Sequence, residues 1–185
     1  PKHHRQRLAH VPDTQTRPER RPQAGPKEYY QDQYQPRPQT PEDTYSYAVM
    51  LFDQEKYDQV VSSLAGYCSV NKTDLKANVL LAKAYLQKCS RFKEQGNEHW
   101  KTLVYTPYKM SKAMLAYQKD PKVYDFNRYL PDILYIAAWS FYINNRSSRA
   151  RKYILRAMEL TQTPKAEYLF LLGDIDAEKA IESRS

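Results

Sequence analysis

Apolar residues recur every three to four positions along much of this chain, which is the spacing that places them on one face of an α-helix. The pattern is clear around 48–64, 75–86, 108–117 and 133–157. Runs in which apolar and polar residues alternate, as in a half-buried strand, are not found. The pattern therefore predicts an all-α fold made of short helices.

Four X-Pro pairs indicate where helices begin. Thr40-Pro41, Thr106-Pro107 and Thr163-Pro164 each place a hydroxyl that can cap a helix before a proline. Proline suits the first helical position because the N–H it lacks has no partner within the helix there. Asp120-Pro121 has the same form. We expect a helix to start at each of these pairs.

A period of 34 residues relates the first two helical segments. Ala48 and Ala82 lie 34 positions apart, and each is followed three positions later by a large apolar residue, Leu51 or Tyr85. This period is typical of a helix-turn-helix repeat. A third segment repeats the arrangement, with small residues where two helices approach and large residues in the seam between them: Ala138, Phe141, Ala150, Ile154 and Ala157.

This pattern resembles the tetratricopeptide repeat superfamily. The resemblance covers a unit at 41–72, a second unit that starts near 75, a third at 131–164 and a terminal helix from Pro164. It implies a short right-handed α-solenoid of antiparallel helix hairpins, with about three units followed by the terminal helix. In that helix, Leu169, Leu172 and Ile175 are predicted to share one face, which either caps the array or docks on a partner.

The second unit is interrupted. At the expected position, its second helix would turn Arg91, Glu94 and Glu98 toward the core. Charged residues cannot form a core, because burying an unpaired charge is too costly. We therefore expect an inserted loop at about 90–105, a second helix at 108–117 and a connector at 120–130 that contains a short helix.

The composition changes near residue 42. Eight of the twelve prolines lie in the first 41 residues, among Gln and Arg, and only Leu8 and Val11 there are aliphatic beyond Ala. Such a segment buries too little apolar surface to offset its ordering entropy. The sequence predicts a basic arm at 1–41, disordered or extended over a partner, and a helical domain at 42–182. Within the arm, Tyr29, Tyr30 and Tyr34 form either a docking patch or part of an inert linker.

The resemblance also implies a concave groove, because the first helix of each unit lines such a groove in the tetratricopeptide family. An aromatic lining suits an apolar helix or an extended segment of a partner. The alternative is that these side chains pack within the array. Ala138 is expected at the closest helix contact, and Trp139→Ala is expected to weaken partner binding while leaving the fold largely intact. The predicted groove residues are Tyr45, Val49, Phe52, Lys76, Val79, Lys83, Leu86, Tyr135, Trp139 and Tyr142.

A basic stripe follows the third unit's first helix. Arg146, Arg149, Lys152 and Arg156 recur at helical spacing, opposite the small and apolar residues of the same segment. Such a stripe is either a solvated helix face or a contact for an acidic partner, a nucleic-acid backbone or an anionic surface. The net charge of +8 is compatible with each of these.

Residue patterns for catalysis are missing from the sequence. Three histidines, His3, His4 and His10, lie in the arm, and His99 has no Cys or paired carboxylate near it. No glycine-rich phosphate loop, nucleophile motif or metal-ligand spacing occurs. We expect a protein that is not an enzyme, with no cofactor, no metal and no small-molecule substrate.

Cys68 and Cys89 lie in apolar helical patterns and are predicted to be buried small residues rather than a disulfide. This favours a reducing compartment, the cytoplasm or nucleus, with an organelle or the periplasm left open. The longest uncharged run, 133–143, has about half of the roughly 20 residues that a membrane-spanning helix needs, so no transmembrane segment is expected.

Two classes of function remain after these exclusions. The first is a protein-interaction scaffold or adaptor subunit of a larger assembly, which binds a partner through the groove and the arm. The alternative is a nucleic-acid-associated helical protein of a ribosomal or RNA-processing particle, which contacts phosphates through the arm and the basic stripe.

Overall fold

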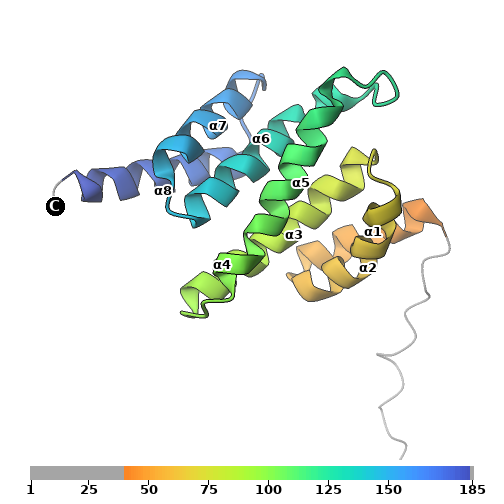
Figure 1. Cartoon of the computed structure of the whole chain (residues 1–185), viewed down its shortest axis with the longest axis horizontal. Coiled ribbons are helices and arrows are strands. Elements are labelled where there is room, and N and C mark those ends of the chain that lie inside the picture. Colours follow the sequence, from red (N-terminus) through yellow and green to blue (C-terminus); the bar gives the residue numbers. More distant parts are fainter. Residues whose placement is uncertain (1–39, 184–185) are drawn as a thin grey trace, which may run out of the picture. The chain divides into compact units, whose positions relative to one another are not determined.

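The computed structural model of the chain describes residues 40–183, without the side chain of Glu182. These residues form helices and connecting turns with no strand among them, which confirms the predicted all-α class (Figure 1). The predicted arm at 1–41, including its three tyrosines, lies outside the described residues except for Thr40 and Pro41. The elements are α1 (Pro41–Asp53), α2 (Tyr57–Val70), α3 (Leu75–Glu94), α4 (Trp100–Leu103), α5 (Tyr105–Leu115), the 3₁₀ helix η2 (Ala116–Lys119), α6 (Phe126–Ile143), α7 (Ser147–Glu159) and α8 (Ala166–Glu182).

The start of α1 is formed by the residues that the sequence indicated. The Thr40 hydroxyl accepts a hydrogen bond from the Asp43 N–H at 3.1 Å, and the Asp43 carboxylate accepts one from the Thr40 N–H at 3.1 Å. This reciprocal pair is a capping box, and Pro41 occupies the first helical position as expected. Local sequence alone is therefore enough to fix this helix end.

The other three X-Pro pairs do not start helices. Thr106-Pro107 lies inside the first turn of α5, and α8 begins at Ala166, after Pro164. Asp120 ends η2, and its side chain accepts a hydrogen bond from the Lys122 N–H at 2.9 Å, which makes a turn. The predictions were wrong here because a proline in the first turn, or in a loop just before it, costs no more than one at the first position.

The predicted loop at 90–105 is also corrected, since most of it is helical. α3 continues to Glu94, and α4 follows after a short turn. The charged side of this extension faces outward: Arg91 binds the Glu55 carboxylate at 2.5 Å and its guanidinium lies 4.6 Å from the Tyr57 ring centre. Its apolar side is completed by the fully buried Cys89. The helix persists because these charged residues do not have to enter the core.

The connector predicted at 120–130 is shorter than expected. α6 begins at Phe126, so the helix that was expected from 131 contains Pro131 in its second turn. Pro131 has no N–H to donate to the preceding turn, and this cost is offset by burial of Phe126 and of Pro131 itself.

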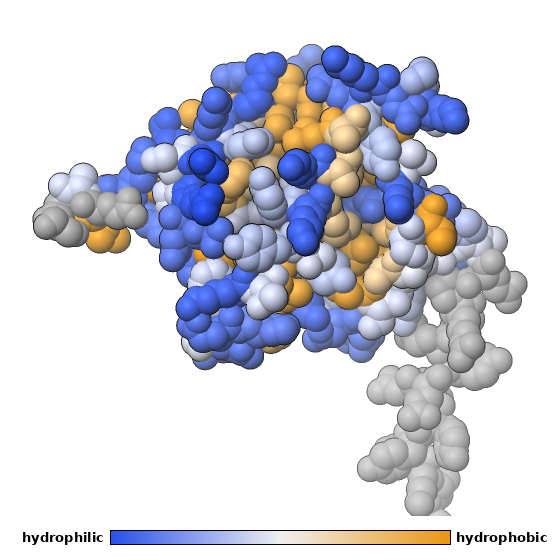
Figure 2. Space-filling view, in the orientation of Figure 1, coloured by the Kyte–Doolittle hydropathy of each residue, from blue (hydrophilic) through white to orange (hydrophobic). Residues whose placement is uncertain are grey.

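Each long helix packs against its neighbours in the sequence. α1 packs on α2, α2 on α3, α5 on α6, α6 on α7 and α7 on α8, and α3 also contacts α5 and α6. Figure 1 shows α3 and α5 in the middle, with α1 and α2 on one side and α6 to α8 on the other. On the face seen in Figure 2, apolar side chains are visible in the upper and central parts, with hydrophilic side chains between them and along the edges.

The seam between α6 and α7 agrees with the prediction. Ala138, Ala150, Ile154 and Ala157 have no exposed surface and belong to one apolar cluster. Small side chains at 138 and 150 let the two helices approach closely.

The apolar face predicted for α8 is only partly buried. Tyr168, Leu171 and Ile175 are buried against the α6–α7 cluster, whereas Leu169 is 52% exposed and Leu172 is half-buried. Both sets have helical spacing, so the sequence pattern did not distinguish them. The packing of Tyr168 against α6 decides which one is buried.

Cys68 and Cys89 are free thiols in buried positions, as predicted. Burial raises the pKa of each thiol to about 12. Within residues 40–183, no helix has the length and hydropathy needed to cross a membrane.

Candidate functional site

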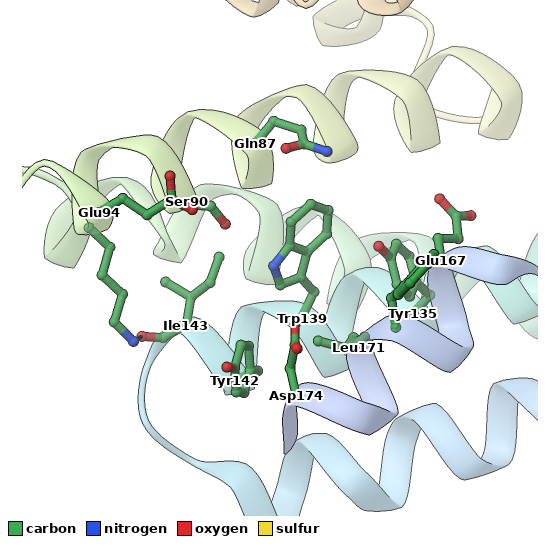
Figure 3. Close-up of a pocket in the computed structure, with 12 residues that line it drawn as sticks. Gln87, Ser90, Glu94, Tyr135, Trp139, Tyr142, Ile143, Glu167, Leu171 and Asp174 are labelled. Atoms are coloured by element: carbon green, nitrogen blue, oxygen red, sulfur yellow. Dashed lines mark hydrogen bonds between the residues drawn. The ribbon is translucent and has the colours of Figure 1, made fainter. Parts of the chain in front are cut away.

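A cavity of about 530 Å³ lies between α3, α6 and α8. Side chains from one face of each helix converge on it, at the spacing of three or four residues that keeps them on one side (Figure 3). We call it the α3–α6–α8 cavity. Its lining residues are Gln87, Ser90, Lys93 and Glu94 of α3, Tyr135, Trp139, Tyr142 and Ile143 of α6, and Glu167, Phe170, Leu171 and Asp174 of α8.

Trp139 lies in the middle of this cavity. Figure 3 shows its indole between the α3 residues Gln87 and Ser90 on one side and Asp174 of α8 on the other. The ring is half-buried and packs against two apolar clusters of the fold. Its centre lies 5.5 Å from that of the Tyr135 ring. Trp139 is thus held in place while part of its surface remains available.

Two other aromatic residues of the lining differ in exposure. The Tyr135 ring is only 5% exposed, because it lies 5.1 Å from the Tyr168 ring between α6 and α8. Phe170 is 75% exposed. A phenylalanine so far out of the core contributes little to folding and offers apolar surface to a bound molecule.

A buried ionic network adjoins Glu167 in the lining and joins the three helices. The Asp132 carboxylate of α6 lies 3.1 Å from the Lys83 ammonium of α3 and 2.7 Å from that of Lys165, just before α8. Tyr168 donates a hydrogen bond to the same carboxylate at 3.0 Å, and Glu167 binds Lys83 at 2.7 Å. The network fixes the relative positions of the helices that form the cavity.

The protonation states of this network follow from its geometry. Burial alone would raise the pKa of Asp132, but Lys83 and Lys165 more than offset this and hold it below its usual value. Burial alone would lower the pKa of Lys83, and Asp132 and Glu167 raise it instead. The charges are therefore balanced inside the protein and are not available to a ligand.

Lys93 is held at a different place on the lining. Its ammonium donates hydrogen bonds to the Ile143 carbonyl at 3.0 Å and to the Asn145 side-chain oxygen at 2.8 Å. A cation at this position neutralises the negative end of the α6 helix dipole. Lys93 thus satisfies the last carbonyl of α6 and connects α3 to the turn before α7.

Two carboxylates of the lining have no such partner. Glu94 and Asp174 are exposed, and their side chains form no ion pair or hydrogen bond with any residue at 40–183. Burial raises the pKa of Tyr142, and the nearby carboxylates of Asp174 and Glu178 raise it further. Outside the Glu167–Lys83 pair, the charged side chains of the lining are therefore Lys93, Glu94 and Asp174, which leaves a net negative charge.

The structure divides the predicted groove residues into separate groups. Tyr135, Trp139 and Tyr142 line the cavity, and Lys83 adjoins it within the ionic network. Val79 and Leu86, which were expected to face a partner, are buried in the core because α3 packs against α6 with that face.

The predicted groove residues at the start of the helical part lie elsewhere. Tyr45, Val49 and Phe52 of α1 are half-buried against the cluster formed with α2 and α3. Lys76 binds Glu42 at 3.0 Å and lies 4.0 Å from the Tyr45 ring centre. They do not line the cavity, so the predicted site extends over fewer helices than expected.

Sequence reasoning missed the contributions of the α3 polar residues and of α8. The terminal helix was expected either to cap the array or to dock on a partner through Leu169, Leu172 and Ile175, so Phe170 and Asp174 were not considered. Their separation of four residues, which puts both on one face of the helix beside the buried residues, was the available signal.

The predicted basic stripe is exposed on and just before α7. Arg146, Arg149 and Lys152 form no ion pair with another described residue, whereas Arg156 binds Glu159 at 2.8 Å. Arg146 and Arg149 share a small cavity of about 90 Å³ with the exposed Tyr105. This aromatic neighbour comes from α5 and could not be seen in the stripe's own sequence.

Among the residues that the structure describes, no three His, Cys, Asp or Glu side chains are grouped so that they could hold a metal ion. His99 is exposed, and its ring lies 5.7 Å from that of Phe92. Comparisons of the sequence with protein-family models and with curated proteins give no match.

Proposed function

We propose that this chain is a non-catalytic interaction scaffold, an adaptor subunit of a larger assembly that holds a segment of a partner protein in the α3–α6–α8 cavity. The observation that carries the proposal is the arrangement of Trp139, Tyr142 and Phe170 around an open cavity of about 530 Å³. Binding energy at protein interfaces is concentrated in aromatic side chains of this kind.

The proposed architecture supports this function. We take α1–α2, α3–α5 and α6–α7 as three hairpins that, with α8, form a short right-handed solenoid resembling tetratricopeptide repeats. In that scheme α3, α6 and α8 are the first helices of successive units, and these are the helices that line the cavity. The family resemblance implies a groove along the first helices, and this supports the proposal that the cavity is part of that groove.

The chemistry of the lining favours binding over reaction. Its residues within 40–183 include no histidine or cysteine, and the ammonium of Lys93 is held by the end of α6. In the full proposal the arm at 1–41, with Tyr29, Tyr30 and Tyr34, supplies a second contact with the partner. The free thiols fit a reducing compartment such as the cytoplasm or nucleus.

The test is a selection of random 12-residue peptides displayed on phage, with the full chain as bait. The affinity of the selected peptides is then measured by fluorescence anisotropy for the wild type, for Phe170→Ala and for Tyr124→Ala. The Tyr124→Ala change removes a 93% exposed aromatic residue outside the cavity. We expect Phe170→Ala to weaken binding by about tenfold or more and Tyr124→Ala to leave it unchanged. Peptides that bind both variants equally well, or a selection that yields none, would contradict the proposal.

A second candidate function rests on a different observation: Arg146 and Arg149 share a small cavity with Tyr105, and neither they nor the exposed Lys152 form an ion pair with another described residue. Cations that neutralise phosphates and an aromatic ring that stacks on a base form a surface for single-stranded nucleic acid. The probe is a 20-nucleotide single-stranded RNA, titrated at several salt concentrations. If this surface binds RNA, the affinity of the double variant Arg146→Gln, Arg149→Gln should fall less steeply with salt concentration than that of the wild type. Lys119→Gln, an exposed control on η2, should leave the salt dependence unchanged.

A further inference from the structure

We propose that the α3–α6–α8 cavity selects a cationic anchor, a lysine or arginine side chain of the partner segment, which lies over the indole of Trp139 between the carboxylates of Glu94 and Asp174. This inference rests on the proposed function and specifies the chemistry of its partner. It replaces the apolar segment that the sequence favoured.

The first argument is the charge of the lining. Its charged residues are Lys93, Glu94, Glu167 and Asp174. Lys93 is hydrogen-bonded to Ile143 and Asn145, and Glu167 is neutralised by Lys83 at 2.7 Å. Glu94 and Asp174 remain without partners within residues 40–183, and together they outweigh the single positive charge of Lys93, whose own partners are uncharged.

The second argument is the electrostatic environment of the tyrosines in the lining. Burial raises the pKa of Tyr135, and the charged groups that act on it, Glu167 and Asp132, raise it further. At Tyr142, the charges of Asp174 and Glu178 act in the same direction as burial. At Tyr45 on α1, burial raises the pKa while nearby charges act in both directions, with Lys76 and Lys83 lowering it and Asp74 and Glu42 raising it. Of these carboxylates, Asp174 is the one that lines the cavity without an ion-pair partner in the described residues, so its charge is felt inside the cavity.

The third argument is the aromatic floor. A cation over an aromatic ring is attracted by its negative face, and tryptophan is the strongest of the aromatic side chains in this respect. Trp139 is held in position by its packing against two clusters, so little ordering is needed when the cation arrives. Phe170 and Leu171 can cover the aliphatic stem of the same lysine or arginine.

An apolar anchor would fit this cavity less well. It would remove water from Glu94 and Asp174 without supplying a counter-charge, and desolvating an unpaired carboxylate is costly. The chain has a net charge of +8, but charges beyond about 10 Å are largely screened at physiological salt, so the local carboxylates decide.

The experiment uses peptides from the selection described above with the full chain. In each peptide, every lysine is replaced in turn by norleucine and every arginine by citrulline, which keep the shape of the side chain and remove its charge. One such replacement should weaken binding at least about tenfold. Asp174→Asn and Glu94→Gln should each weaken binding about three- to tenfold, with a stronger effect at low salt. Asp53→Asn, an exposed control on α1 outside the lining, should change nothing.

A charge exchange gives the sharpest comparison. Asp174→Lys should abolish binding of the cationic peptide and restore binding of the same peptide with glutamate at the anchor position. Recovery of this kind requires direct proximity and is not expected from a general loss of stability.

The outcomes separate the two proposals. Peptides that lose affinity on Phe170→Ala but need no cation, or that use an acidic or apolar anchor, would overturn the cationic anchor and leave the proposed function in place. Peptides insensitive to Phe170→Ala would overturn both. If sedimentation shows that the full chain self-associates and Phe170→Ala abolishes this, the occupant is a second copy and the cationic anchor is also rejected.

Discussion

The ammonium of Lys83 in α3 lies 3.1 Å from the Asp132 carboxylate in α6, and only 15% and 12% of the two side chains are exposed. Lys83 had been expected to face a partner from the groove. It instead neutralises a buried carboxylate of its own chain, and the same carboxylate binds Lys165 and Tyr168. One acidic residue thus connects the three helices that surround the candidate site.

The first prediction concerns Asp132→Asn. Loss of this carboxylate leaves the buried Lys83 with Glu167 as its remaining counter-ion, and Lys165 can turn toward solvent. Breaking a buried pair costs about 3–5 kcal/mol when the other charge is left alone, so we expect a loss of about 2–3 kcal/mol here. Urea denaturation at pH 7 measures this loss. Asp53→Asn at an exposed position is the control, and equal losses in both variants would refute the assignment.

The pH dependence of the same variant follows from the direction of the pKa shift. The pKa of Asp132 is lower in the folded protein than in the unfolded chain, where it is about 4. Its contribution to the free energy of unfolding is complete above about pH 4 and is lost as the pH falls through the lower folded value. The difference between wild type and Asp132→Asn should therefore be full at pH 7 and shrink below about pH 4.

The second prediction concerns Ala138→Leu in the seam between α6 and α7. Ala138 has no exposed surface and shares a cluster with Ala150, so three extra carbon atoms have no space. Overpacking should lower the free energy of unfolding by about 1–3 kcal/mol. Ala113→Leu, at an exposed position of α5, is the matched control and should have little effect. A melting curve that is unchanged for Ala138→Leu would show that the seam is loosely packed.

The third prediction concerns the two buried thiols. With the pKa of Cys68 and of Cys89 raised to about 12, only about one thiol in ten thousand is ionised at pH 8, and the thiolate is the reactive form. Both thiols should react slowly with an aromatic disulfide reagent in the native chain and rapidly in 6 M guanidinium. Fast reaction of either thiol in the native protein would mean that its helix opens readily.

Elements set by local chemistry could be predicted from the sequence. The Thr40–Asp43 capping box and the small residues at 138 and 150 were expected because each depends on residues within one or two helices. The start of α6 was not, since it depends on tertiary burial of Phe126, which outweighs the usual cost of Pro131 inside a helix.

The candidate site was predictable only in part, because some of its contacts join residues far apart in the sequence. Trp139 and Tyr142 could be placed because the family resemblance implies a groove along the first helix of each unit, and both residues line the cavity. The contact between Lys83 and Glu167 joins positions 84 residues apart, and no periodic pattern indicates such a pair. On α8, two faces were equally apolar, so the choice between Tyr168 and Leu169 for the core required knowledge of what α8 packs against.

The last prediction revises the expectation for Trp139→Ala. The sequence indicated that this change would leave the fold largely intact, but the indole packs against two apolar clusters and is half-buried. Truncation of a fully buried tryptophan costs about 3–5 kcal/mol, so we expect about 2 kcal/mol for Trp139→Ala. Phe170→Ala, at a 75% exposed position of the same cavity, should cost less than about 0.5 kcal/mol.

The comparison that decides this is thermal melting of the two variants together with Trp139→Phe, which keeps an aromatic ring in the cavity. We expect Trp139→Phe to recover most of the stability lost in Trp139→Ala, because a ring still fills the space between the clusters. A weaker cation–π attraction should still reduce the affinity for a cationic peptide, since phenylalanine attracts a cation less strongly than tryptophan. If Trp139→Ala melts like wild type, the indole is not part of the core, and its rigid position in the cavity loses its structural basis.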